Sequence, residues 1–114
     1  MCIFCDIFQK KTDTEIIYED DNFVAFNDIL PKAPIHILIV PKRHIGSVKD
    51  TDETSETLLG KMIIAAKTIA ERHSLNGYKL IFNVGKEGGQ IVDHLHLHLL
   101  GGWSNKDNPD KFRA

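Results

Sequence analysis

The chain has 114 residues, of which 42% are hydrophobic and 26% charged, and its formal net charge at pH 7 is −2. This length predicts a single domain over 1–114 with one core. A near-neutral charge without a basic run argues against nucleic acid as a partner. The apolar stretch Ile35 to Val40 is too short to cross a membrane, and no apolar leader follows the N-terminus, so a cytoplasmic location is expected.

The first half of the chain predicts a short helix followed by three strands. Isoleucine and phenylalanine recur at helical spacing over residues 3–8. A loop is expected over 30–34, because two prolines cannot continue a central strand. Strands are expected on either side of this loop, at Glu15–Glu19, Phe23–Asp28 and Ile35–Val40.

The second half predicts one long helix and two more strands. The helix is expected from about Asp52, a suitable N-cap, to about His73, a C-terminal position favoured by the helix dipole. Its apolar stripe is expected to consist of Leu59, Met62, Ile63, Ala66, Ile69 and Ala70. The remaining elements are a strand over Tyr78–Val84, a glycine-rich loop over Gly85–Gln90 and a strand over His94–Leu100. This order predicts an α+β fold, with an antiparallel sheet of about five strands and the helices on one face.

The last predicted strand carries three histidines at alternate positions, His94, His96 and His98. Side chains of a strand alternate between its faces, so the imidazoles share one face and the leucines share the other. Imidazole titrates near neutrality and serves as nucleophile, acid, base or metal ligand. Two chemistries fit this spacing equally: a three-histidine metal site with a position open for water, and attack by a neutral imidazole on an electrophile.

Three further features accompany these histidines. His36 lies on the third predicted strand, where a buried, hydrogen-bonded histidine is the simpler interpretation unless the two strands are neighbours. The glycine-rich loop would let backbone amides approach a phosphate, although a plain hairpin turn explains the loop alone. Cys2 and Cys5 form a C-x-x-C pair, which indicates half of a metal site rather than a disulfide framework.

The run His94–Leu100 reads His-Φ-His-Φ-His-Φ-Φ, where Φ is apolar, and with it the chain resembles the histidine triad (HIT) superfamily. The resemblance covers nearly the whole chain. Within the superfamily, the chain looks most like the Hint branch, the purine nucleoside phosphoramidases. The other matching segments are 26–29, 31–36, 41–44, Asn83, 88–90 and 101–102. The resemblance implies a HIT-like fold that pairs its sheets in a homodimer.

The resemblance also implies an enzyme that transfers a nucleotide to histidine and then to water. His96 matches the nucleophile, which would attack the α-phosphorus of a nucleoside phosphoramidate or a related nucleotide. Water would then release the nucleoside monophosphate, expected to be AMP. His98 matches the residue beside the phosphate and leaving group, and His36 matches an additional active-site histidine.

Other matches place a purine nucleotide as the substrate. Asp28 corresponds to the ribose-binding carboxylate, and Asn83, Gly89 and Gln90 correspond to the phosphate site. The base and ribose pocket is expected from a mostly apolar set: Ile3, Phe4, Ile7, Phe26, Asn27, Ile29 and Leu38. For Phe4 and Phe26, ordinary core packing is an equally good account.

One position departs from the family pattern. Many Hint proteins carry a serine directly after the loop glutamine, where this chain has Ile91, and isoleucine donates no hydrogen bond. The alternative function is therefore a purine-nucleotide-binding or scaffold protein with little turnover.

The resemblance completes the metal site begun by the two cysteines. HIT proteins with an N-terminal C-x-x-C add a histidine after the third strand and the first histidine of the signature. Here the four ligands would be Cys2, Cys5, His44 and His94, holding one structural Zn²⁺ per chain; the alternative is a pair of free thiols in a short helix. No organic cofactor is expected.

Overall fold

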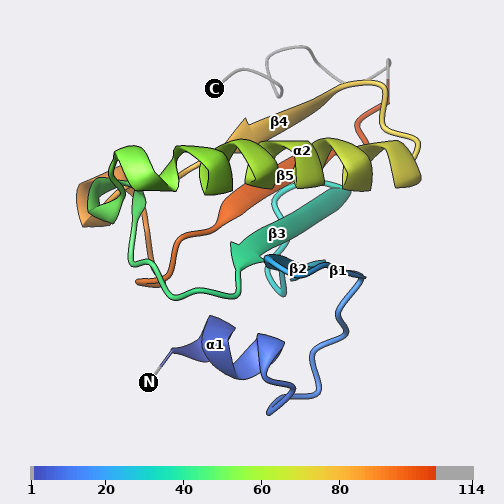
Figure 1. The fold of residues 1–114 in the computed structure, drawn as a ribbon. Helices are drawn as coiled ribbons and strands as arrows, with labels where there is room; N and C mark the ends of the chain where they lie inside the picture. The colour runs from blue at the N-terminus through green and yellow to red at the C-terminus, as the bar shows by residue number, and fades with distance from the viewer. Residues whose placement is uncertain (1, 105–114) are drawn as a thin grey trace.

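The computed structural model describes residues 2–104, and residues 105–114 of the predicted domain lie outside the described part (Figure 1). Its strands form one antiparallel sheet in the order β1-β2-β3-β5-β4. They span Tyr18–Glu19 (β1), Phe23–Asn27 (β2), Ile35–Pro41 (β3), Tyr78–Ile81 (β4) and Leu97–Gly101 (β5). The helices are α1 (Ile3–Phe8) and α2 (Glu56–Arg72), with 3₁₀ turns at Val48–Asp50, Glu53–Ser55 and Lys86–Gly88. The predicted α+β class, the five strands and both helices are confirmed.

The two helices lie on opposite faces of the sheet (Figure 1). The long helix α2 covers the face that carries Phe23, Ile37 and Leu99. The short helix α1 instead packs Phe4 and Ile7 against Val24, Phe26, Leu38 and Val40 on the other face. The prediction that both helices cover one face is therefore wrong. Strands β2 and β3 are buried on both sides, so each side needs a covering element.

Helix α2 follows the predicted range closely but buries a slightly different stripe. The Asp52 side chain caps the 3₁₀ turn that leads into α2. The helix ends where Ser74 takes a left-handed conformation with φ of 57°. Ile63, which was expected in the core, is 44% exposed, while Ala65 is 4% exposed and packs there instead.

The histidine-bearing segment enters the sheet later than expected. Strand β5 begins at Leu97, so of the three histidines only His98 lies in the ladder. The preceding backbone turns away, because the Leu95 amide donates to the Ile45 carbonyl at 2.6 Å. The alternation of faces nevertheless holds: Leu95, Leu97 and Leu99 all join the core beneath α2. Strands β1 and β4 are also shorter than predicted.

Among residues 2–104, no helix combines the length and the apolar character that crossing a bilayer requires.

Candidate active site and metal centre

Two histidines on neighbouring strands meet on the face of the sheet that α1 covers. In the ladder between β3 and β5, Leu38 is opposite His98, and His36 is opposite Leu100. His36 Nε2 lies 2.9 Å from His98 Nδ1. The interpretation of His36 as an isolated core histidine is thereby removed, because its partner comes from the triad.

Asp28 completes this group from the end of β2. Its amide donates to the His36 carbonyl at 2.9 Å, and its Oδ2 lies 3.5 Å from His36 Nε2. Burial lowers the pKa of His36, and the Asp28 charge opposes that effect. Asp28, His36 and His98 are thus close enough to act on one small group, a metal ion included.

His96 is buried, with 7% of its surface exposed, and its ring is held from two sides. Its Nδ1 lies 2.7 Å from the carbonyl oxygen of His94. A carbonyl only accepts, so the neutral ring carries its proton on Nδ1 and has its lone pair on Nε2. The Phe4 ring contacts the imidazole edge-on at 5.1 Å between centroids. Burial lowers the pKa of His96, which keeps Nε2 free to react as a nucleophile.

His98 is the most strongly perturbed histidine of the site. Burial lowers its pKa to about 4, and the neighbouring His96 and His36 rings add to the effect. Its ring centroid is 5.0 Å from that of His96. At neutral pH, His98 is therefore uncharged beside an uncharged His96.

The loop over residues 83–90 is tied together by its own side chains. Gln90, which is 6% exposed, accepts from the Gly85 amide at 3.0 Å and donates to the Gly46 carbonyl at 2.7 Å. Asn83 Nδ2 donates to the Gly88 carbonyl at 2.9 Å. The amides of Gly88, Gly89 and Gln90 donate to carbonyls inside the loop, so these three do not form the expected nest of free amides.

The residues expected to bind the nucleoside separate into a buried group and an exposed group. Phe4, Ile7, Phe26 and Leu38 form one buried cluster beneath the triad face. Asn27, Ile3 and Ile29 are exposed, the last with 89% of its surface accessible. Ile91 is also exposed, at 92%. A hollow of about 700 Å³ lies elsewhere, lined by residues that include His73, Tyr78 and Trp103.

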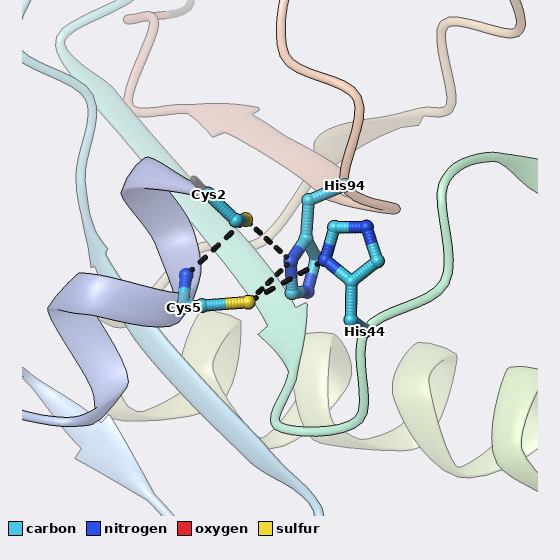
Figure 2. A group of neighbouring side chains, drawn as sticks. All are labelled: Cys2, Cys5, His44 and His94. Atoms are coloured by element: carbon cyan, nitrogen blue, oxygen red, sulfur yellow. Dashed lines mark hydrogen bonds between the residues drawn. The ribbon is translucent and has the colours of Figure 1, made fainter.

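A second group of side chains joins α1 to the segment before β5 (Figure 2). Cys2 Sγ lies 3.0 Å from His94 Nδ1, and Cys5 Sγ lies 3.4 Å from His44 Nδ1 and 3.5 Å from His94 Nδ1. All four ligand atoms lie within 4.8 Å of one another. The structure therefore brings together the four zinc ligands that the family resemblance implies.

The chemistry of this group fits a zinc ion. A tetrahedral Zn²⁺ places sulfur and nitrogen ligands about 3.5 Å apart. His94 Nε2 lies 2.9 Å from the Pro41 carbonyl, so its proton belongs on Nε2 and its Nδ1 lone pair faces the sulfurs. Burial and the adjacent Cys2 raise the pKa of the Cys5 thiol to about 11. A bound cation would reverse that shift, since coordinated thiols lose their protons.

Comparison with known proteins identifies the family. The model "Scavenger mRNA decapping enzyme C-term binding" matches residues 1–108. A purine nucleoside phosphoramidase of Escherichia coli is 46% identical over 102 residues, which cover 88% of this chain and 86% of that protein. The solved structure of a HIT family hydrolase from Legionella pneumophila shares 45% identity with a TM-score of 0.88, covering 91% of this chain and 95% of that one. The chain belongs to the histidine triad family. The predicted membership in this family of enzymes is confirmed.

A third HIT relative bears on the metal group. The crystal structure of a Zn-bound histidine triad protein from Mycobacterium smegmatis has a TM-score of 0.80 and 29% identity, covering 96% of this chain and 84% of that one. In this chain, the Cys2, Cys5, His44 and His94 group offers a complete set of ligands for such an ion.

Two backbone groups of this HIT site were missed by sequence reasoning. The Pro41 carbonyl orients His94, and the Lys32 amide donates to His36 Nδ1 at 3.0 Å. Every residue but proline has both an amide N–H and a carbonyl, so no pattern of side chains singles these two out.

Proposed function

We propose that this HIT protein hydrolyses a nucleoside phosphoramidate or a related purine nucleotide at its α-phosphorus through a covalent intermediate on His96. The observation that carries the proposal is the His96 Nδ1 contact to the His94 carbonyl at 2.7 Å, which leaves Nε2 as a neutral nucleophile inside a buried site. The name of the 46% identical relative, a purine nucleoside phosphoramidase, supports this class of substrate.

The reaction consists of two displacements at phosphorus. In the first, the His96 Nε2 lone pair forms a bond to the α-phosphorus, and the bond to the leaving group breaks. The leaving group departs with that electron pair beside His98 and takes up one proton from solvent, so that an amine leaves as the neutral molecule. In the second, a water oxygen bonds to phosphorus, the bond from phosphorus to Nε2 breaks, and a water proton is lost to solvent. The products are the nucleoside monophosphate, AMP for an adenosine substrate, and free His96. Dividing the reaction in this way replaces one difficult step by two easier ones.

Several residues around His96 would hold the nucleotide. Asp28 would accept hydrogen bonds from the ribose hydroxyls, and Asn83, Gly89 and Gln90 would shape the phosphate loop. The base would lie against an apolar surface, formed by Ile3, Phe4, Ile7, Phe26, Asn27, Ile29 and Leu38. The exposed residues of this set would contact the base directly, and the buried residues would pack beneath them and support the pocket.

Cys2, Cys5, His44 and His94 would hold one zinc ion. The ion would supply no reactive group; it would cross-link α1 to the segment that carries His96. The cysteines are unpaired thiols, which suits the reducing interior of a cell and the proposed cytoplasmic location.

We also propose that the protein works as a single HIT domain that forms a homodimer. Ile63 on α2 is 44% exposed, and Leu80 on the edge strand β4 is 37% exposed. A second copy that extends the sheet at β4 would cover this apolar surface.

The proposal is tested by trapping the intermediate. The protein is mixed with adenosine 5′-phosphoramidate, and mass spectrometry of the quenched sample is expected to show an adenylyl adduct on His96. His96→Asn is expected to abolish both the adduct and AMP release. His73→Asn serves as the matched control, because His73 is exposed at the end of α2. Turnover that persists in His96→Asn would refute the proposal.

The alternative, a nucleotide-binding protein with little turnover, rests on Ile91. Its side chain is 92% exposed where many Hint proteins place a hydroxyl. AMP binding in calorimetry without turnover would favour the alternative, and a large gain in turnover for Ile91→Ser would support the enzyme. Activity that a chelator destroys but His96→Asn leaves unchanged would instead favour metal catalysis.

A further inference from the structure

We propose that the backbone amide of Lys32 sets the tautomers of His36 and His98, so that His98 presents an uncharged Nε2–H to the substrate. The part that His98 plays in catalysis rests on the proposed function, but the tautomers themselves do not. The proposal assigns a positioning role to the loop over residues 29–34.

The first step is the contact between the loop and His36. The Lys32 amide donates to His36 Nδ1 at 3.0 Å, and His36 is 5% exposed. A backbone N–H has no lone pair, so Nδ1 must be the acceptor and must carry no proton. A neutral His36 then holds its proton on Nε2. A charged ring would set two N–H groups against each other, so the amide also opposes protonation.

The second step is the hydrogen bond between His36 and His98, which fixes the tautomer of His98. His36 Nε2 lies 2.9 Å from His98 Nδ1 and 3.5 Å from Asp28 Oδ2, and both of these atoms can accept its proton. The contact to His98 is the shorter one, and two ring nitrogens 2.9 Å apart have room for one proton between them, so the His36 Nε2–H donates to an unprotonated His98 Nδ1. The proton of a neutral His98 is left on Nε2. The pKa of His98, which burial lowers to about 4 with a smaller contribution from the neighbouring rings, agrees with a ring that stays neutral.

His98 and His96 carry their protons on opposite ring nitrogens. The His94 carbonyl forces the His96 proton onto Nδ1 and leaves Nε2 with a lone pair. The two rings lie 5.0 Å apart between centroids. One ring therefore offers a nucleophile and its neighbour offers a hydrogen-bond donor, without either ring carrying charge. His98 then stabilises the phosphate or the leaving atom by hydrogen bonding rather than by giving up an imidazolium proton.

The loop that supplies the amide is fixed at both ends. The Leu30 amide donates to Asp28 Oδ1 at 2.9 Å, and the Asp28 amide donates to the His36 carbonyl at 2.9 Å. Pro31 and Pro34 limit the backbone freedom on either side of Lys32. The Lys32 side chain is exposed, so it is the amide and not the charge that matters here.

The test reads the tautomers directly by NMR on the zinc-loaded protein at neutral pH, with ¹⁵N in the histidine rings and the backbone. Long-range ¹H–¹⁵N spectra are expected to show His36 and His98 protonated on Nε2, and His96 protonated on Nδ1. Coupling across the two N–H···N hydrogen bonds is expected between Lys32 N and His36 Nδ1, and between His36 Nε2 and His98 Nδ1. A proton on Nδ1 of His36 or His98, or the absence of both couplings, overturns the proposal.

A matched pair of variants isolates the amide. Lys32→Ala retains the N–H and is expected to keep every tautomer, whereas Lys32→Pro removes it and is expected to give mixed tautomers at His36 and His98. In turnover of the phosphoramidate, Lys32→Pro is expected to lower kcat about tenfold, the effect of losing about 1.4 kcal/mol, with little change in KM. Unchanged tautomers in folded Lys32→Pro overturn the role of the amide. If Lys32→Pro fails to fold, the couplings across the two N–H···N hydrogen bonds of the unmodified protein still test the role of the amide. The expected tautomers in a protein without turnover would refute the proposed function and leave this proposal standing.

Discussion

The depressed pKa of His98 makes the protein's stability depend on pH in a way that one substitution should reveal. His98 lies between His36 and His96, and its pKa falls from 6.5 to about 4 in the folded protein. As pH drops below 6.5, the unfolded chain binds a proton at His98 that the folded chain does not. The stability associated with a neutral His98 is therefore fully present above pH 6.5 and is lost as pH falls towards 4.

The size of this effect follows from the shift in pKa. Each pKa unit corresponds to about 1.4 kcal/mol, so crossing the whole window would cost the folded state about 3 kcal/mol. Between pH 7 and pH 4.5, the unmodified protein should lose about 2 kcal/mol more unfolding free energy than His98→Gln, whose side chain does not titrate. Acid also weakens zinc binding, but it does so in both proteins, so the difference between them isolates His98.

Urea unfolding followed by circular dichroism at a series of pH values measures this difference. His73→Gln is the control for replacing a histidine outside the site, because His73 is exposed at the end of α2. Parallel stability curves for the unmodified protein and His98→Gln would show that His98 is protonated equally in both states and would refute the reasoning.

Three further predictions concern the metal group, the loop and the core. Cys5→Ser should lower the zinc content from about one ion per chain to well below one in protein purified without chelator, since a structural site needs four ligands; unmodified protein that contains no zinc would contradict this. Gly89→Ala should weaken AMP binding in calorimetry, because φ at Gly89 is 87° and a side chain there costs about 1–2 kcal/mol of strain; unchanged affinity would mean that the loop conformation does not matter for binding. Ile69→Ala should lower the unfolding free energy by about 3 kcal/mol, because Ile69 is 1% exposed in the core under α2. Its AMP affinity should stay within about twofold of normal, and a larger loss would show that this core and the site are coupled.

Periodicity and spacing in the sequence were sufficient to predict the elements and the separation of the histidines from the leucines. Alternation placed Leu95, Leu97 and Leu99 in one core, because a pleated backbone points successive side chains to opposite sides. This held even at Leu95, which precedes β5. The C-x-x-C pair and His44 were matched to His94 by resemblance, and the structure brings these four ligand atoms together.

Only the tertiary structure decided which face of the sheet each helix covers. It also decided which ring nitrogen is protonated in each histidine of the site. The burial of β2 and β3 on both sides required helices on opposite faces of the sheet. The apolar sequence of a strand does not indicate which helix covers which of its faces. The tautomers of His94, His96 and His36 depend on the Pro41 carbonyl, the His94 carbonyl and the Lys32 amide. Those groups are common to nearly every residue, so their partners are determined by how the chain folds and not by which side chains it carries.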